Sequence, residues 1–265
     1  MDQVYTSIML DATPDGVAVV TLNRPEKHNA FNAIVIEELA DAFETLRGED
    51  HLRLVILRGA GKSFSAGADL DWMKSAANYT QRENEADAVQ LAEMLRKLYE
   101  LPQTTLALVQ GAAMGGGAGL VAACDVAIAL KGTKFRFSEV RLGLTPATIS
   151  PFVVQAIGPS WARALFVTGE SFDAAYAEKI GLVHYTAADD EEMLALEEHI
   201  AKLAFAAAPG AVADAKDLVR DVAGMPISET LGHETARRIA ARRASDEGRE
   251  GLAAFLEKRK PGWAG

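Results

Sequence analysis

One stretch of the chain carries three consecutive glycines, followed by an apolar segment with no ionisable side chain before its last residue. It is GAAMGGGAGLVAACD, residues 111–125. Small residues after a strand let a ligand approach backbone N–H groups. If a helix begins at Gly116 and runs through Leu120 to Ala123, its dipole favours negative charge at that end. The alternative is that the glycines only permit a tight turn and close helix packing.

A second stretch, SFSAGADLDWM at residues 63–73, is also rich in small residues and also follows a predicted strand. One backbone N–H from each stretch, converging on the same point, would form an oxyanion hole. The two stretches therefore indicate a site that stabilises a developing negative charge with backbone groups.

Glu139 is the candidate acid or base. It lies within KFRFSEVRLGLTPATISPF, residues 134–152, among Phe135, Phe137, Val140, Leu142 and Leu144. Apolar surroundings desolvate a carboxylate and raise its pKa toward a value that suits proton transfer. A solvated surface glutamate is the alternative, and the composition of the neighbourhood leaves both open.

Two other patterns do not predict a functional site. GAGKS, residues 59–63, would need a glycine five positions before Gly61 to be a phosphate-binding loop, and Ile56 stands there. The five histidines have no metal-ligand spacing, so no metal site is predicted.

The elements that would position these residues alternate between strand and helix. Four short apolar runs, each ended by a turn signal, predict strands: residues 17–23, 52–59, 104–111 and 124–130. Asn32 is a predicted N-cap for a helix whose apolar face carries Ile36, Leu39, Phe43 and Leu46. A long helix is expected at 81–100.

After about Pro151 the strand signals are absent, and the pattern predicts only helices. Their expected ranges are 161–167, 173–180, 190–207, 211–223, 228–243 and 246–258. Asp173 and Ser228 are predicted caps, and Gly181 and Gly224 are predicted stops. The expected fold class is thus α/β, with a helical C-terminal region.

Composition limits the functional class. The 265 residues carry a net charge of −10, which opposes binding to nucleic acid or to an anionic membrane. The one cysteine, Cys124, lies in an apolar run and is expected in the core. No apolar segment reaches the length of a membrane span, and the N-terminus lacks a secretory pattern, so a cytoplasmic location is expected.

Six motifs, in this order and spacing, resemble the crotonase (enoyl-CoA hydratase/isomerase) superfamily. They are LNRPEKHNAFN, GKSFSAGADL, GAAMGGGAG, CDVAIA, SEVRLGLTP and FLEKRKPGW. The resemblance implies a spiral core of ββα units over residues 1–200. It also implies a helical region over 201–265 that builds a homotrimer or a dimer of trimers.

The resemblance also implies an acyl-CoA substrate, with no separate cofactor because the coenzyme A thioester is the substrate. The thioester oxygen would lie between the N–H groups of Ala66 and Gly116, and Glu139 would be the acid/base. Residues implied to bind CoA are Ala68, Asp69 and Leu70 at its adenine end, Lys27 at its phosphates, and Lys258 with Lys260 near the C-terminus. Five further residues could line the acyl pocket or belong to the core: Trp72, Met73, Tyr79, Ile149 and Phe152.

The sequence departs from the family pattern at Gly119, where the well-studied hydratases carry the first of two glutamates. The closest resemblance is to bacterial methylglutaconyl-CoA and isohexenylglutaconyl-CoA hydratases, which favours hydration of a branched, carboxylated 2-enoyl-CoA. A Δ3,Δ2-enoyl-CoA isomerase that uses Glu139 alone is the first alternative. A non-catalytic acyl-CoA-binding or RNA-binding protein is the second, and the net charge argues against the RNA role.

Overall fold

The computed structural model describes residues 4–264. The chain divides after Glu198 into two compact units. The helix α7 (Asp190–Ala206) contains the boundary.

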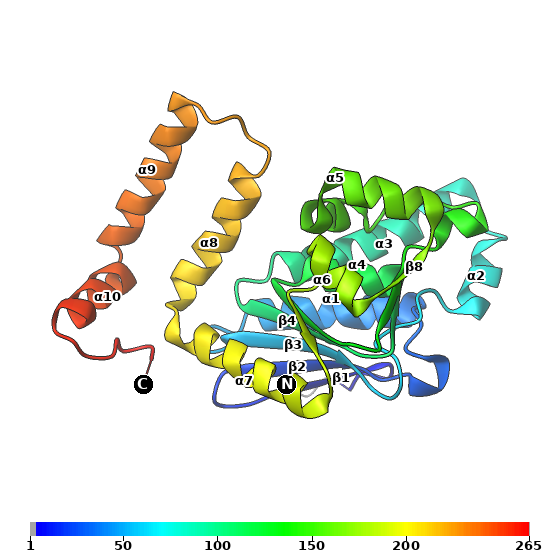
Figure 1. The fold of residues 1–265 in the computed structure, drawn as a ribbon, viewed down its shortest axis with the longest axis horizontal. Coiled ribbons are helices and arrows are strands. Elements are labelled where there is room, and N and C mark those ends of the chain that lie inside the picture. The colour runs from blue at the N-terminus through cyan, green and yellow to red at the C-terminus, as the bar shows by residue number, and fades with distance from the viewer. Residues whose placement is uncertain (1–3, 265) are drawn as a thin grey trace. The chain divides into compact units, whose positions relative to one another are not determined.

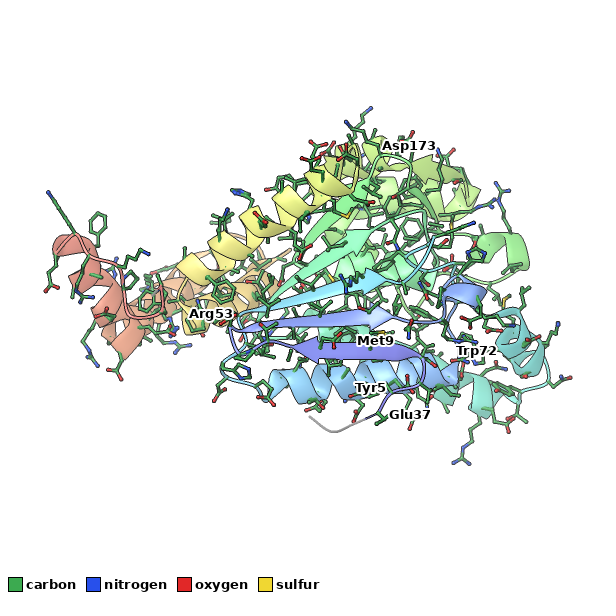
Figure 2. All side chains as sticks on the ribbon, turned by 90° about the horizontal axis from the view of Figure 1, so that it is seen from below. Tyr5, Met9, Glu37, Arg53, Trp72 and Asp173 are labelled. Carbon is green, nitrogen blue, oxygen red and sulfur yellow. The ribbon has the colours of Figure 1, made fainter. Side chains whose placement is uncertain are left out.

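The first unit is built on a six-stranded sheet with the order β1-β2-β3-β4-β6-β9. Its strands are β1 (Ile8–Ala12), β2 (Val17–Leu22), β3 (Leu54–Gly59), β4 (Thr104–Val109), β6 (Val126–Leu130) and β9 (Tyr185–Ala187). β1 runs antiparallel to β2, and the remaining pairs are parallel. In Figure 2 the arrow of β1 points opposite to those of β2 and β3. Because parallel strands end at the same edge, the segments after β3 and β4 emerge together.

A second, three-stranded sheet has the order β5-β7-β8. Its strands are β5 (Ala112–Met114), β7 (Lys134–Arg136) and β8 (Ser171–Asp173). Ser65 extends this sheet through a parallel bridge to Ala113. The chain therefore visits the large sheet, then the small sheet, and then a helix, turn after turn, which is the expected spiral of ββα units.

The helices of this unit are α1 (Ala33–Arg47), α2 (Leu70–Ala76), α3 (Gln81–Tyr99), α4 (Gly116–Ala123), α5 (Ser150–Thr168) and α6 (Ala174–Ile180), with the 3-10 helices η1 (Pro25–Lys27) and η2 (Glu139–Leu142). α1 packs on α3, α3 on α4, and α4 on α5, as the ribbon in Figure 1 shows. This succession surrounds α4 with other helices, and seven of its eight residues are buried.

The local predictions for α1 are confirmed. The Asn32 side chain accepts a hydrogen bond from the Val35 amide at 3.0 Å, as an N-cap does. All four apolar side chains of the predicted face are buried. The helix therefore ends up where its periodicity predicts, with its apolar face in the core.

All four predicted strands are present, but the expectation of no strand after Pro151 is wrong. β8 and β9 lie in that region, and each has only three residues. A run of three residues is too short to establish a period of two. These segments are stabilised as strands by pairing with their neighbours and not by their own amino-acid composition.

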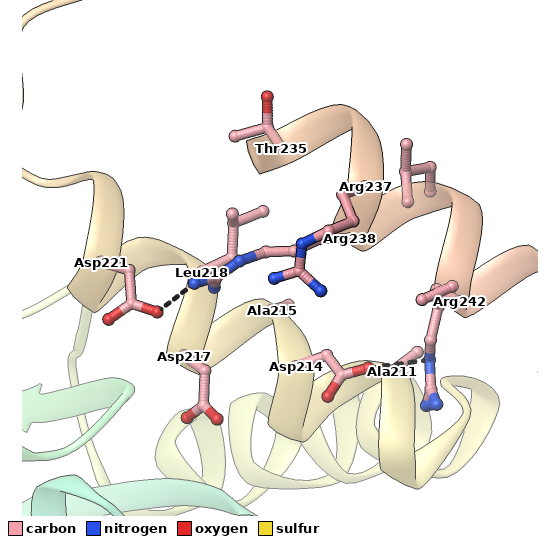
Figure 3. Close-up of a pocket in the computed structure, with 12 residues that line it drawn as sticks. Ala211, Asp214, Ala215, Asp217, Leu218, Asp221, Thr235, Arg237, Arg238 and Arg242 are labelled. Atoms are coloured by element: carbon pink, nitrogen blue, oxygen red, sulfur yellow. Dashed lines mark hydrogen bonds and ion pairs between the residues drawn. The ribbon is translucent and has the colours of Figure 1, made fainter. Parts of the chain in front are cut away.

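The second unit is helical, as expected. It contains the end of α7 and then α8 (Pro209–Val222), α9 (Glu229–Ala244) and α10 (Asp246–Leu256). α8 and α9 are joined by the ion pairs Arg238–Asp221 at 2.6 Å and Arg242–Asp214 at 3.2 Å (Figure 3). Across residues 4–264, no helix is long and apolar enough to cross a membrane.

Candidate active site

Glu139 lies at the start of η2, and its carboxyl group faces the N-terminus of α4. A methyl group built on Gly115 would lie 3.1 Å from Oε1 of Glu139. The other oxygen, Oε2, is buried and has no hydrogen-bond partner among the described residues. A buried carboxyl oxygen without a partner is costly to maintain, so the group is available to a ligand.

Burial sets the electrostatics of Glu139. Desolvation raises the pKa of its carboxyl above the ordinary value, and a hydrogen bond from its own backbone amide offsets part of the rise. The surrounding residues from 140 to 157 include one charged side chain, Arg141. The expectation of a partly desolvated glutamate is confirmed, and the alternative of a solvated surface residue is wrong.

The N-terminus of α4 provides unused backbone donors. Helix α4 begins at Gly116, as predicted, and the cap residue Gly115 has φ 48° and ψ −116°, which L residues rarely adopt. The first amides of a helix have no acceptor within it. The Gly116 amide donates to no described residue, so it remains free beside Glu139.

The segment after β3 is bonded to β5 through its backbone. The Ser65 amide donates to the Ala112 carbonyl at 2.9 Å, and the Met114 amide donates to the Ser65 carbonyl at 2.9 Å. On the other edge of this segment, the Ala66 amide donates to the His28 carbonyl at 2.9 Å. The expectation that Ala66 supplies an oxyanion donor is therefore wrong, because its N–H is already used.

The free donor in this segment belongs to Ala68 instead. Its amide donates to none of the described residues, whereas the next amide, of Asp69, donates to the Phe31 carbonyl at 2.7 Å. Successive N–H groups of an extended segment point to opposite edges, so the Ala68 N–H is directed away from Phe31. The Phe31 ring itself contacts Gly116, since a methyl group built there would lie 2.9 Å from Cε2 of Phe31.

The structure thus brings Gly116 and Glu139 together and replaces Ala66 with Ala68 as the second free amide. Strict alternation would direct the amides of residues 66 and 68 to the same edge, but Gly67 between them has φ 92° and interrupts the extended backbone. The sequence does not reveal this local turn, so it could not show which of the two amides is free.

Asp69 has a structural role that the sequence analysis did not assign to it. Its Oδ2 accepts a hydrogen bond from Arg24 at 2.9 Å, and its Oδ1 accepts one from the Asp71 amide at 2.8 Å. The Asp69 side chain is only 6% exposed. Both carboxylate oxygens are therefore turned inward and occupied, so a contact between Asp69 and the adenine end of CoA, which stays a prediction, would involve its backbone and not its carboxylate.

The other residues implied to bind CoA differ in setting. Leu70 begins α2 and is 73% exposed, which is unusual for a large apolar side chain. Lys27 is also exposed, and its Nζ lies 3.4 Å from Oδ2 of Asp71, beside Leu70. Lys258 and Lys260 lie in the second unit, so the structure does not relate them to this site.

Two of the possible pocket residues belong to the core. Phe152 is buried and meets the ring of Tyr99 edge to face, with the ring centroids 5.4 Å apart. Ile149 is 1% exposed, and its Cγ2 would lie 2.4 Å from a methyl group built on Gly119. Trp72 is half-buried and donates from Nε1 to Asp87 at 3.3 Å.

Replacing Gly115 with Ala is expected to reduce both stability and turnover. The new methyl group would force a left-handed backbone on alanine and would press on the Glu139 carboxyl. The expected loss is about 1–3 kcal/mol in the free energy of unfolding, measured by denaturant titration, with a fall in kcat. Gly132→Ala is the matched control, since nothing lies within 4 Å of its new methyl group. Equal stability and kcat for the two variants would contradict the expectation.

Comparisons with known proteins show the family to which the chain belongs. Residues 12–265 match the enoyl-CoA hydratase/isomerase family. The crystal structure of an enoyl-CoA hydratase from Shewanella pealeana has 38% identity and a TM-score of 0.94, with 99% of this chain and 97% of that chain covered. A crystal structure of an enoyl-CoA hydratase/isomerase from Marinobacter aquaeolei has 34% identity and a TM-score of 0.91, covering 98% and 99%.

A curated relative, the enoyl-CoA hydratase AKT6-1 of Alternaria alternata, is 32% identical over 205 residues, which are 77% of this chain and 67% of the relative. The match in sequence extends over nearly the whole chain, and the solved structures share its fold at high similarity. The chain is therefore an enzyme of the enoyl-CoA hydratase/isomerase family, the crotonase family.

Proposed function

We propose that the enzyme adds water across the C2=C3 bond of a 2-enoyl-CoA thioester, with Glu139 as the acid/base. The observation that carries this proposal is the buried Oε2 of Glu139, which has no hydrogen-bond partner among the described residues, in a carboxyl group whose other oxygen covers Gly115, the residue before the free amide of Gly116. The hydratase names of relatives with 31–38% identity support the same reaction.

In this mechanism the thioester oxygen accepts hydrogen bonds from the amides of Ala68 and Gly116. The water oxygen forms a bond to C3, and the π electrons of C2=C3 move into the thioester as an enolate. Glu139 gives its proton to C2, and the proton that the water loses restores the carboxylic acid. The two amides and the α4 dipole stabilise the enolate charge, a contribution of about 3–4 kcal/mol for one such donor.

The pH dependence of kcat/KM is set by the protonation state of Glu139 that this mechanism requires. The protonated form of Glu139 is the active one in hydration, so kcat/KM is constant below its pKa and falls as pH rises through it. Because burial raises that pKa, the active range extends to a higher pH than for an exposed glutamate.

For the substrate, we propose a branched acyl chain with a distal carboxylate, such as 3-methylglutaconyl-CoA. Glycine at position 119 leaves the site without a second carboxylate to orient the water, and a carboxylate on the substrate would supply one. Arg141 is the candidate partner for that group. It is exposed, and its side chain lies against Gly169 at the edge of η2.

Initial rates on three thioesters test this proposal. We expect faster hydration of 3-methylglutaconyl-CoA than of crotonyl-CoA, and little conversion of a 3-enoyl-CoA. Hydration is measured as the loss of the absorbance of the conjugated enoyl thioester, and isomerisation as its gain. Equal rates on the two 2-enoyl substrates would remove the role of the substrate carboxylate. Activity confined to the 3-enoyl substrate would establish the isomerase.

The isomerase is the second candidate because one observation favours it. The space over Gly119 is filled by Ile149, and a single carboxyl group can carry a proton between C4 and C2 of the acyl chain. In that reaction no water needs to be activated, so one acid/base group is sufficient.

We also propose that the enzyme forms a homotrimer or a dimer of trimers and that it is cytoplasmic. The second unit exposes several large apolar side chains, of which Ile227, Phe255 and Leu256 are exposed by 78% or more. A neighbouring copy of the chain would cover them in the assembly that the family resemblance implies.

A further inference from the structure

Two glycines at the N-terminal end of α4, the cap residue Gly115 and Gly119 inside the helix, are covered by two different side chains. Gly115 and Gly119 are four residues apart, and the Gly119 amide donates to the Gly115 carbonyl at 3.0 Å. That hydrogen bond places the two backbone segments one helical turn apart. Glu139 covers Gly115 and Ile149 covers Gly119, so the two side chains lie over adjacent turns at this end of α4.

The contact between Ile149 and Gly119 leaves no free volume. A methyl group built on Gly119 would lie 2.4 Å from Cγ2 and 3.0 Å from Cβ of Ile149, and 3.8 Å from Cδ1 of Leu95. Cγ2 is attached directly to the branched Cβ, so it cannot swing away as the end of a flexible chain can. Hydrocarbon therefore occupies the space into which any side chain at position 119 would project.

On the basis of the proposed function, we propose that Ile149 is a positioning residue for Glu139. It closes the space beside the carboxyl group with hydrocarbon, keeps water away from that side, and leaves the site with one acid/base group.

The charged side chains near Glu139 contact other groups, so desolvation is the main influence on the pKa of its carboxyl. Helix α4 and the first half of α5, residues 150–157, contain no ionisable side chain. Arg141 lies with Nε 3.3 Å from a methyl group built on Gly169, and Nε of Arg136 in β7 donates to the Gly169 carbonyl at 2.7 Å. On α3, Arg96 is engaged with Glu93 and Glu100.

The decisive experiment compares Ile149→Ala with Ile157→Ala. Ile157 is likewise a buried isoleucine, 4% exposed, and it lies within α5, about two turns beyond Ile149, the cap residue of that helix. Each truncation removes the same atoms from the core, so each lowers stability, but only the first opens a path for water to Glu139. The readout is the pH profile of kcat/KM on the thioester that the wild type converts fastest.

We expect the midpoint that reports Glu139 to move to lower pH by about 0.5–1 unit in Ile149→Ala, because a better hydrated carboxyl ionises more easily. In Ile157→Ala the midpoint is expected to stay at the wild-type value. Equal midpoints in the two variants would overturn the role of Ile149.

A second measurement tests the packing of Ile149 against Gly119 without relying on enzyme activity. Gly119→Ala is expected to lower the melting temperature markedly, and Gly119→Ala combined with Ile149→Ala is expected to lose less than the sum of the two single changes. Strict additivity would show that Ile149 does not fill this space. The melting data are independent of the reaction, whereas a wild type that hydrates no enoyl-CoA would overturn the proposed function alone.

Discussion

Replacing Glu139 with Gln is expected to lower kcat by about 10²–10⁴-fold, with the dissociation constant of the CoA thioester nearly unchanged. Glutamine has the same size and keeps the contact over Gly115, but it cannot give a proton to C2 or take one back. Steady-state rates and calorimetric binding of a non-reactive acyl-CoA measure the two quantities separately. A binding protein without catalysis would show no activity to lose.

Glu37→Gln is the matched control. Glu37 is exposed on α1, and the same change there is expected to leave both quantities at the wild-type values. If Glu139→Gln retained turnover within a few fold, the buried carboxyl would not be the proton carrier, and the proposed mechanism would be wrong.

Replacing Asp69 with Ala is expected to lower the free energy of unfolding by about 3–5 kcal/mol, because it leaves the Arg24 guanidinium largely buried and without its carboxylate. The change also removes the acceptor for the Asp71 amide at the start of α2. Since Ala68 is the preceding residue, kcat is expected to fall as well. Denaturant titration and steady-state rates provide the two measurements.

Two further variants separate the causes. Asp69→Asn keeps an acceptor for the Asp71 amide and is expected to lose less than Asp69→Ala. Asp11→Ala, on an exposed position of β1, is expected to be neutral. A loss for Asp69→Ala no larger than for Asp11→Ala would contradict the structural role of the ion pair.

The pH dependence of this stability has a definite sign. The hydrogen bond from the Asp71 amide, followed by the interaction with Arg24, holds the pKa of Asp69 below its usual range. A folded-state pKa below the unfolded value contributes stability above the unfolded pKa of about 3.9 and loses it as pH falls through the folded value. The difference between wild type and Asp69→Asn is therefore expected to shrink in acid.

Much of the fold follows from local sequence patterns. Four of the five strands with five or six residues, namely β2, β3, β4 and β6, carry enough β-branched and apolar side chains to be predicted from the sequence, whereas β1 was not predicted. The caps at Asn32, Asp173 and Ser228 each accept the expected backbone hydrogen bond. The strands of three residues could not be predicted, because their stability comes from pairing with segments far away in the chain. β5 pairs with β7, for example, across 22 positions of sequence.

The site was predicted less completely. The apolar residues around Glu139 and the glycine run made a partly buried carboxyl and free amides candidates, but the sequence left a solvated glutamate and a merely structural turn open. The sequence does not reveal that the Ala66 amide meets His28 or that Arg24 pairs with Asp69, because both contacts join segments whose approach depends on the whole spiral. The contact between Ile149 and Gly119, thirty positions apart, is equally hidden.

The backbone bonds between Ser65 and β5 have a consequence for the energetics of the reaction. They fix the segment bearing Ala68 to the segment bearing Gly116 through main-chain groups, so the spacing of the two proposed donors is set when the protein folds. Solvent dipoles must reorient around a new charge, whereas donors fixed in this way already point at it. Little reorganisation energy is therefore needed when the enolate forms, because the folding free energy of the spiral has already oriented the donors. This holds for whichever acyl chain occupies the site.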